Sequence, residues 1–439
     1  MKQKILIYME NLLPANGISK PRVTERIWVS CCIGFLTLFI LCSCKKELET
    51  PKETEQPTTV QTSLTRIIKT PVKGNTHLPR LRAQYGKLHM TWVEQEGDLA
   101  ILNYAVYDND TWSTTRTISS GKDWFVNGAD FPALAINGET VLTNLLQKSA
   151  EGTYDYDIKL NLLAGDKVLK SDFLLHTDGI PAEHGFVAMA PYDDGFYVSW
   201  LDGRNTKNEN KENNAMALFS ARVGLDGTIT ESTMIDNRVC DCCNTAIAIT
   251  HQGPVVVYRD RSQDEEEVRD IAIVRWVDGA WTAPKTLYDD SWKINGCPVN
   301  GPAIDALGEN LVVSWFTASD DDPKVNVIFS KDNGATFEEP LRVDTGQAIG
   351  RVDTTFLEDG SALVLWMEPQ QENTVIQLRR VYPDGRMDEA ITIAKTDGAR
   401  SNGFPQLEVI QDTAYITSTE LDGDQSAIKL IALEISSDK

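Results

Sequence analysis

The feature that most constrains this chain is a passage that recurs seven times at spacings of 50 to 59 residues. Each copy opens with a short apolar strand and continues with a second strand, which in most copies ends with an aromatic residue and then a charged one. The copies open at Pro79, Pro132, Phe186, Thr245, Pro302, Val352 and Pro405. Short strands that repeat at this length predict the four-stranded blades of a β-propeller.

The turns between the third and fourth strands of the units support this prediction. They fall at Asp108-Asn109, Ala164-Gly165, Asp226-Gly227, Asp278-Gly279, Asn333-Gly334 and Asp384-Gly385. Asp-Gly and Asn-Gly pairs favour tight hairpins because both residues tolerate positive φ. The units are therefore expected to be antiparallel sheets.

The two ends of the domain are expected to share one blade. The seventh unit stops at its third strand, Ile428–Ile435, and Leu64–Lys69 can supply the missing fourth. This pairing closes the ring and leaves no open sheet edge. The predicted fold is all-β, a propeller of seven four-stranded blades over 62–439. Six blades is the alternative, because the second unit, around Thr140–Leu146, matches the others least.

The N-terminal segment predicts export. Basic residues precede an apolar run, Ile27–Leu41, which is short for a membrane span but right for a signal peptide. The run ends in Leu41-Cys42-Ser43-Cys44, which resembles the bacterial lipobox. The resemblance implies cleavage before Cys44 and a lipid on its thiol; the alternative is an uncleaved anchor helix. Residues 1–43 are then the signal peptide and 44–61 the lipidated cysteine with a flexible tether, since 45–61 lacks apolar runs.

Location and charge limit the partners. The lipid would hold the exported protein to the bacterial outer membrane, and a position on the cell surface is compatible with this anchor. The formal net charge of the chain is −22. Such a surface repels phosphates, so no nucleic-acid partner is expected. It suits a soluble extracellular protein, or one that holds cations.

One hairpin carries a more specific signal. Its residues Ser330, Asp332, Gly334 and Phe337 fit the pattern S-x-D-x-G-x-T-F. This hairpin resembles the Asp box of sialidases and related repeat propellers, in which the motif is structural. The resemblance implies a glycan-handling propeller. Sialidases grip a substrate carboxylate with three arginines and carry an Arg-Ile-Pro signature, which this chain lacks, so no catalytic residue is transferred by motif.

Charged residues are expected to gather on one face of the ring, where loops enter first strands and leave second strands. Arginine suits bidentate capture of an anionic group. The candidate substrate-binding residues are Arg259, Arg261, Arg351, Arg204 and Arg80, and Asp260 or Asp202 is the candidate acid/base. The alternative is a set of mutually paired, solvated charges.

Four cysteines should lie close together on the same face. Cys240, Cys242 and Cys243 lead into one unit and Cys297 leads into the next. Outside the cytoplasm they are expected to form two disulfides. The alternatives are a copper or zinc site and free thiols. The motifs require no other cofactor.

Three functional hypotheses follow from these features. The first is a surface lipoprotein that binds or acts on an anionic glycan, with exo-glycosidase activity as its enzymatic form. The second is a non-catalytic propeller that binds a carbohydrate or a protein. The third is a metal- or redox-linked propeller centred on the cysteines.

Overall fold

The computed structural model describes residues 65–165, 167–208, 214–264, 266–396, 398–422 and 425–435. The predicted signal peptide, Cys44 and the tether lie outside these residues. Within the described ranges, no helix is long and apolar enough to cross a membrane.

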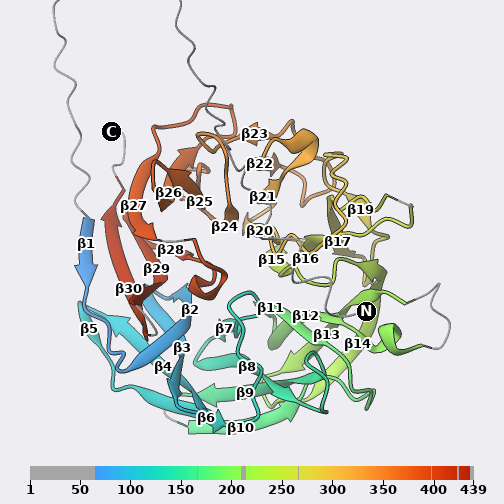
Figure 1. Ribbon diagram of the computed structural model, residues 1–439, viewed down its shortest axis with the longest axis vertical. Helices are drawn as coiled ribbons and strands as arrows, with labels where there is room; N and C mark the ends of the chain where they lie inside the picture. Colours follow the sequence, from blue (N-terminus) through green and yellow to red (C-terminus); the bar gives the residue numbers. More distant parts are fainter. Residues whose placement is uncertain are drawn as a thin grey trace, which may run out of the picture. The chain divides into compact units, whose positions relative to one another are not determined.

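The described residues form seven antiparallel sheets arranged in a ring (Figure 1), which confirms the predicted seven-bladed propeller. The first blade contains β2 (Asn75–Gln84), β3 (Lys87–Glu96), β4 (Leu99–Asp108), β5 (Thr111–Trp112) and β6 (Arg116–Gly121). The second contains β7 (Leu134–Asn137), β8 (Thr140–Lys148), β9 (Tyr156–Ala164) and β10 (Lys167–Leu174). The third contains β11 (His184–Tyr192), β12 (Gly195–Asp202), β13 (Met216–Gly224) and β14 (Ile229–Val239).

The chain continues around the ring in the same order. The fourth blade contains β15 (Ala246–Thr250), β16 (Gly253–Arg259), β17 (Ile271–Val277), β18 (Ala280–Trp281) and β19 (Lys285–Thr286). The fifth contains β20 (Ala303–Leu307), β21 (Asn310–Thr317), β22 (Lys324–Ser330) and β23 (Leu341–Arg342). The sixth contains β24 (Gly350–Phe356), β25 (Ala362–Gln370), β26 (Asn373–Val381) and β27 (Ile391–Thr396). In the described ranges, the short 3-10 helices η1 (Arg204–Lys207), η3 (Ser319–Asp321) and η4 (Arg400–Asn402) lie in loops.

The last blade joins the two ends of the domain, as predicted. It contains β28 (Gln406–Ile410), β29 (Thr413–Asp422), β30 (Gln425–Glu434) and the N-terminal strand β1 (Thr65–Ile68). β1 pairs antiparallel with β30, with Thr65 opposite Leu433 and Ile68 opposite Leu430. This pairing closes the ring between the ends of the described domain.

Hydrophobic contacts between neighbouring blades form the core. Trp92, Trp200, Trp315 and Trp366 each lie on the second strand of a blade and are less than 2% exposed. Trp200 packs with residues of the second blade, and Trp366 packs with residues of the fifth. The aromatic residues that mark the sequence repeat are therefore inter-blade core residues.

The predicted turns have the backbone conformations expected of them. Gly227, Gly334 and Gly385 have φ of 76°, 79° and 88°. In the hairpin that resembles an Asp box, the Asp332 carboxylate accepts hydrogen bonds from the Thr336 backbone N–H (2.9 Å) and hydroxyl (2.6 Å). The Ser330 hydroxyl accepts a hydrogen bond from the Gly334 N–H at 3.0 Å, and Phe337 packs against the core. These side-chain bonds hold the turn.

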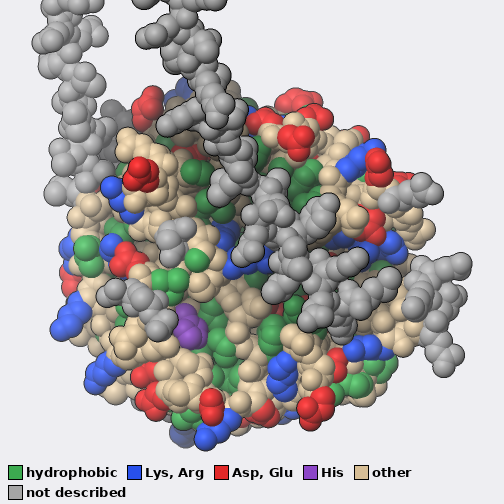
Figure 2. Space-filling model, in the orientation of Figure 1, with side chains coloured by type: hydrophobic (Ala, Val, Ile, Leu, Met, Phe, Trp, Pro, Cys, Tyr) green, Lys and Arg blue, Asp and Glu red, His purple; other side chains and the backbone are tan. Residues whose placement is uncertain are grey.

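The first strands of the blades surround a central channel of about 410 Å³. Its charged lining includes Arg80, Arg82, Asp305, Asp353 and Glu408. Figure 2 shows acidic and basic side chains spread around the ring.

Candidate thiolate site on the axial face

The cysteine segment follows directly from β14, where Val239 is the last strand residue. The Cys240 N–H donates a hydrogen bond to the Arg259 carbonyl oxygen at 3.0 Å, and Val239 forms a bridge with Asp260. The cysteines and the Arg259–Arg261 stretch at the end of β16 therefore lie side by side, as the sequence predicts.

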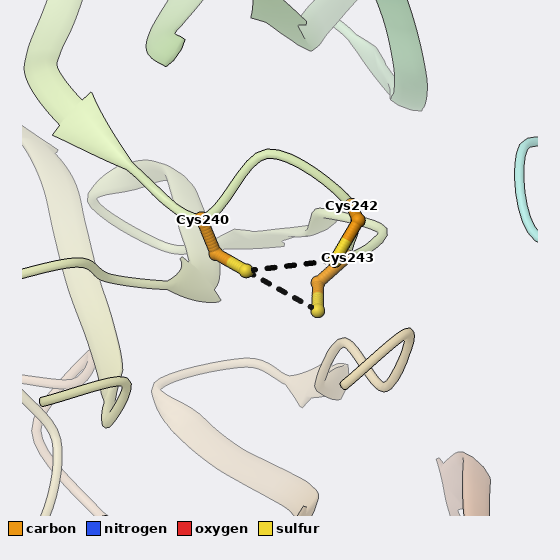
Figure 3. Close-up of side chains that lie close together, drawn as sticks. All are labelled: Cys240, Cys242 and Cys243. Carbon is orange, nitrogen blue, oxygen red and sulfur yellow. Dashed lines mark hydrogen bonds between the residues drawn. The ribbon is translucent and has the colours of Figure 1, made fainter. Parts of the chain in front are cut away.

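Three sulfur atoms converge in this segment. The Sγ atom of Cys240 lies 3.9 Å from that of Cys242 and 3.6 Å from that of Cys243. Figure 3 shows the three side chains pointing toward one another from a single loop. Cys240 and Cys243 are buried and Cys242 is half-buried. All three, and Cys297, are free thiols in this structure. The two expected disulfides stay a prediction.

The next blade supports the cysteine segment through a close backbone approach. A Cβ atom on Gly301 would lie 2.0 Å from the carbonyl oxygen of Asn244, so only glycine fits there. This approach brings Asn300 against the cysteines, and its N–H donates to the Cys243 sulfur at 3.4 Å. The loop from Asn295 to Pro302, which contains two glycines and two prolines, therefore sets the position of Cys243.

A buried arginine lies against the sulfurs. Arg269 is 4% exposed, and its Nη1 donates to the Cys240 sulfur at 3.0 Å while its Nη2 donates to Glu267 at 2.7 Å. Contacts with the thiols of Cys242 and Cys243, and then the charge of Arg269, lower the pKa of Cys240 well below its usual value. Burial raises the pKa of Cys243.

A second group of ligand atoms shares Cys242. The Asp241 carboxylate, the Cys242 sulfur and the Cys297 sulfur lie within 4.8 Å of one another. Cys297 is exposed, and the Asp241 side chain is 42% exposed. In the described part of the chain, the four sulfurs do not make a single set within that distance, so Cys242 stands between an inner trio and an outer one.

Two of the predicted substrate-binding arginines support loops. Arg259 is 1% exposed, and its guanidinium donates to the carbonyl oxygens of Asn300 (2.9 Å), Arg269 (2.5 Å) and Phe316 (2.7 Å). Arg351 is also buried and donates to carbonyl oxygens of the loop around η4, including that of Gly398 at 3.0 Å. These two guanidinium groups are directed at backbone oxygens.

The other predicted arginines have acidic or amide partners. Arg261 donates to Glu267 at 2.7 Å and Arg204 donates to Asp202 at 2.6 Å. Arg80 lines the central channel and contacts Gln406.

The two predicted acid/base residues differ in environment. Although burial opposes the change, hydrogen bonds from His184 and Arg204 lower the pKa of Asp202 below its usual range. Asp202 is therefore held as a carboxylate. Burial raises the pKa of Asp260 to about 6. Of the two, Asp260 is the one that can hold a proton near neutral pH.

A tyrosine between two carboxyl groups was not predicted from the sequence. The Tyr156 hydroxyl lies 3.1 Å from Asp130 and 3.1 Å from Glu183. Burial raises the pKa of Asp130 to about 7 and that of Glu183 to about 8, and the charge of Asp130 contributes to the second shift. Tyr156 belongs to the least regular unit, and no motif in the sequence marks it.

Two histidines also come together without a spacing signal in the sequence. The rings of His176 and His184 stack with centroids 3.8 Å apart. The Nδ1 atom of His176 lies 2.7 Å from Asp178, and the Nε2 atom of His184 lies 3.4 Å from Asp178 and 3.5 Å from Asp202. These two histidines, Asp178, Asp202 and Arg204 form a compact group in which basic and acidic side chains alternate.

Comparisons with known proteins add nothing finer than the fold. No protein-family model matches the sequence, and no curated protein matches it significantly. The chain is similar in structure to a polysaccharide lyase (10% identity, 82% of this chain and 90% of that one, TM-score 0.48). It is also similar to the endosialidase of phage phi92 (9% identity, 86% and 70%, TM-score 0.46) and to the alpha-L-arabinanase of Penicillium chrysogenum (13% identity, 85% and 98%, TM-score 0.44).

These three proteins are named for activities on glycans, but likeness at this level transfers no activity. Together, the fold and the site define a class, a seven-bladed β-propeller with a cluster of thiols beside the end of β16 in the fourth blade. The particular function is argued below from the site itself.

Proposed function

We propose that this chain is an exported, lipid-anchored propeller that binds a thiophilic metal ion, copper or zinc, through Cys240, Cys242 and Cys243. The observation that carries the proposal is the convergence of three free thiols at sulfur separations of 3.6 and 3.9 Å. Two sulfurs that each lie about 2.3 Å from one ion are about 3.8 Å apart in tetrahedral geometry. A disulfide needs about 2.05 Å. Thiolates that share one ion would have separations of this size, which supports the proposal.

The surroundings of the thiols also suit an ion. Arg269 offsets the negative charge that the thiolates carry once their protons are lost. The Asn300 N–H and the Arg269 guanidinium donate to two of the sulfurs, as partners of metal ligands commonly do. Burial of Cys240 and Cys243 keeps water away from the ion.

Metal titration of the purified full-length protein in detergent tests the proposal. Under anaerobic, reducing conditions we expect one equivalent of Cu(I) or Zn(II) to bind in competition with a coloured chelator. Cys243→Ser should weaken that binding by about a hundredfold or more, because a buried thiolate ligand is lost. Asp264→Asn, an exposed change on the same face, is the control and should bind like the wild type.

Two outcomes would contradict metal binding. One is the absence of competition with the chelator by reduced wild-type protein. The other is a thiol titration of protein isolated without reductant that finds two disulfides among Cys240, Cys242, Cys243 and Cys297, together with full stability of that oxidised form.

Export and lipidation are a separate part of the proposal, supported by the lipobox-like Leu41-Cys42-Ser43-Cys44. Mass spectrometry of the isolated protein should find an N-terminal Cys44 that carries acyl chains. Cys44→Ser should release the domain from the membrane fraction. An intact N-terminus in the mature protein would contradict it.

Glycan binding or hydrolysis is a second candidate, favoured by the group around Tyr156. Hydrolysis of a glycosidic bond needs two carboxyl groups near each other, one of them protonated near neutral pH. Asp130 and Glu183 share the Tyr156 hydroxyl, and both have raised pKa values. Arg261, Arg204 and Arg80 are then the residues that would hold an anionic sugar group.

Assays with fluorogenic glycosides, sialosides included, test the second candidate. We expect turnover that is lost in Glu183→Gln and kept in the exposed control Glu266→Gln. Glycan-array binding without turnover would indicate a binding module, and neither binding nor turnover would exclude this candidate.

A further inference from the structure

The inner and outer trios of ligand atoms share a single sulfur. Cys240, Cys242 and Cys243 make the inner trio, and Asp241, Cys242 and Cys297 make the outer one. The members of each trio lie within 4.8 Å of one another. An ion in one trio is therefore already bound to a ligand of the other.

Exposure falls from the outer trio to the inner one. Cys297 is exposed and Asp241 is 42% exposed in its side chain, whereas Cys240 and Cys243 are 0% and 2% exposed. An ion that arrives from solvent therefore meets the exposed Cys297 and Asp241 before the buried Cys240 and Cys243.

Ligand chemistry changes in the same direction. The outer trio contains a carboxylate, a hard ligand, and the inner trio contains only sulfur. Soft ions prefer thiolates over carboxylates, so the inner trio binds such an ion more tightly. Three sulfurs without a fourth suit Cu(I), which accepts three-coordinate thiolate sites, whereas structural zinc takes four ligands.

Arg269 lies between the two trios. Its Nη1 atom is 3.0 Å from the Cys240 sulfur and 3.8 Å from an Asp241 oxygen. A monovalent ion on three thiolates leaves two negative charges, and this buried guanidinium offsets one of them.

We propose that the outer trio is a loading site for Cu(I), and that Cys242 carries the ion from it to the inner trio. This inference rests on the proposed metal-binding function. In the transfer, the ion keeps its bond to Cys242, its bonds to Cys297 and Asp241 break, and bonds to Cys240 and Cys243 form. Cys240 binds as a thiolate, Cys243 gives its proton to the departing Cys297 thiolate, Asp241 leaves as a carboxylate, and copper stays monovalent throughout.

Kinetics of copper uptake test the proposal. The full-length protein in detergent is reduced, freed of reductant and mixed anaerobically with Cu(I) bound to bicinchoninate, whose colour fades as copper leaves it. We expect Cys297→Ser to slow uptake by at least about tenfold while the equilibrium affinity stays within about threefold of wild type. Cys243→Ser should do the reverse, with a fast first contact and a large loss of affinity.

The control variant distinguishes copper uptake through the outer trio from a general effect of surface charge on the uptake rate. Asp264→Asn removes an exposed acidic charge from the same face and should take up copper at the wild-type rate. Circular dichroism of each variant confirms that the propeller is folded.

Each remaining outcome decides against the proposal in a distinct way. Equal uptake rates in Cys297→Ser and wild type would remove the outer trio from the path. Equal losses of affinity in Cys297→Ser and Cys243→Ser would make Cys297 a permanent ligand. Binding of Zn(II) without Cu(I) would overturn the ion assignment but leave the proposed function standing, whereas no metal binding by wild type would end both.

Discussion

The Arg269 guanidinium donates to the Cys240 sulfur at 3.0 Å, from a position that is 4% exposed. A buried positive charge at this place stabilises a thiolate and the negative charge of a metal–thiolate group. Arg269→Gln should therefore lower the affinity for Cu(I) by about ten- to a hundredfold, the range seen when a partner of a metal ligand is lost. Chelator competition measures the change.

The matched control is Lys293→Gln, which removes an exposed positive charge whose partner is Glu266. It should leave the affinity unchanged. If Arg269→Gln and Lys293→Gln bind copper equally well, the buried arginine is not part of the metal site.

Arg259 is predicted to act on stability. Its guanidinium satisfies three carbonyl oxygens from three different loops or strands, and it stacks over Trp292 with the guanidinium carbon 4.8 Å from the ring centroid. Arg259→Met leaves buried acceptors without donors, at about 1–3 kcal/mol each. We expect the free energy of unfolding in urea to fall by at least about 3 kcal/mol, against about 0.5 kcal/mol or less for the exposed Arg386→Met. Loss of ligand binding with unchanged stability would instead return Arg259 to the role of a ligand-binding residue.

Asp130 and Glu183 give the protein a stability that depends on pH. Their folded-state pKa values of about 7 and about 8 lie above the ordinary values near 4. The folded protein therefore holds more protons than the unfolded chain across that interval, so the free energy of unfolding falls as pH rises from about 4 to 8. Each group contributes a slope of at most about 1.4 kcal/mol per pH unit.

Urea unfolding at pH 5, 6, 7 and 8 measures this slope. Asp130→Asn and Glu183→Gln should each make it shallower, because neither amide titrates. Glu266→Gln, a change at an exposed glutamate, should leave it as in the wild type. Slopes that do not differ among the three variants would show that the buried pair is not the source.

The fold could be predicted from the sequence because its signals are local and repeated. Each blade needs a turn residue that tolerates positive φ, such as Gly334, and an inter-blade aromatic residue, such as Trp200 or Trp366. These requirements recur at the blade spacing and are visible without any long-range information. The closing pair of β1 and β30 followed from the missing strand in the last unit.

The site could be predicted only in part. Proximity of the cysteines to Arg259 followed from the blade order, since loops into first strands and out of second strands share a face. The partner of each charged side chain could not be predicted, because a guanidinium that binds carbonyl oxygens and one that faces a ligand look the same in sequence. Tyr156 was missed for a related reason, as its carboxyl partners, Asp130 and Glu183, come from two different loops.

Two glycines of one loop provide the last prediction. A Cβ on Gly301 would lie 2.0 Å from the Asn244 carbonyl oxygen, whereas a Cβ on Gly296 would have nothing within 4 Å. Neither glycine has a positive φ, so alanine strains neither backbone by itself. Gly301→Ala must push the loop of the fifth blade away from the cysteine segment, and with it the Asn300 N–H that contacts Cys243.

We therefore expect Gly301→Ala to lower the free energy of unfolding by about 2 kcal/mol, within the range for overpacking, and to weaken Cu(I) binding by at least about tenfold. Gly296→Ala, next to Cys297, should change neither quantity. Urea unfolding and chelator competition on the two variants decide the matter. Wild-type copper affinity in a destabilised Gly301→Ala protein would mean that the cysteine segment holds its geometry without support from the neighbouring blade, and that the contact between Asn300 and Cys243 does not help to hold the metal.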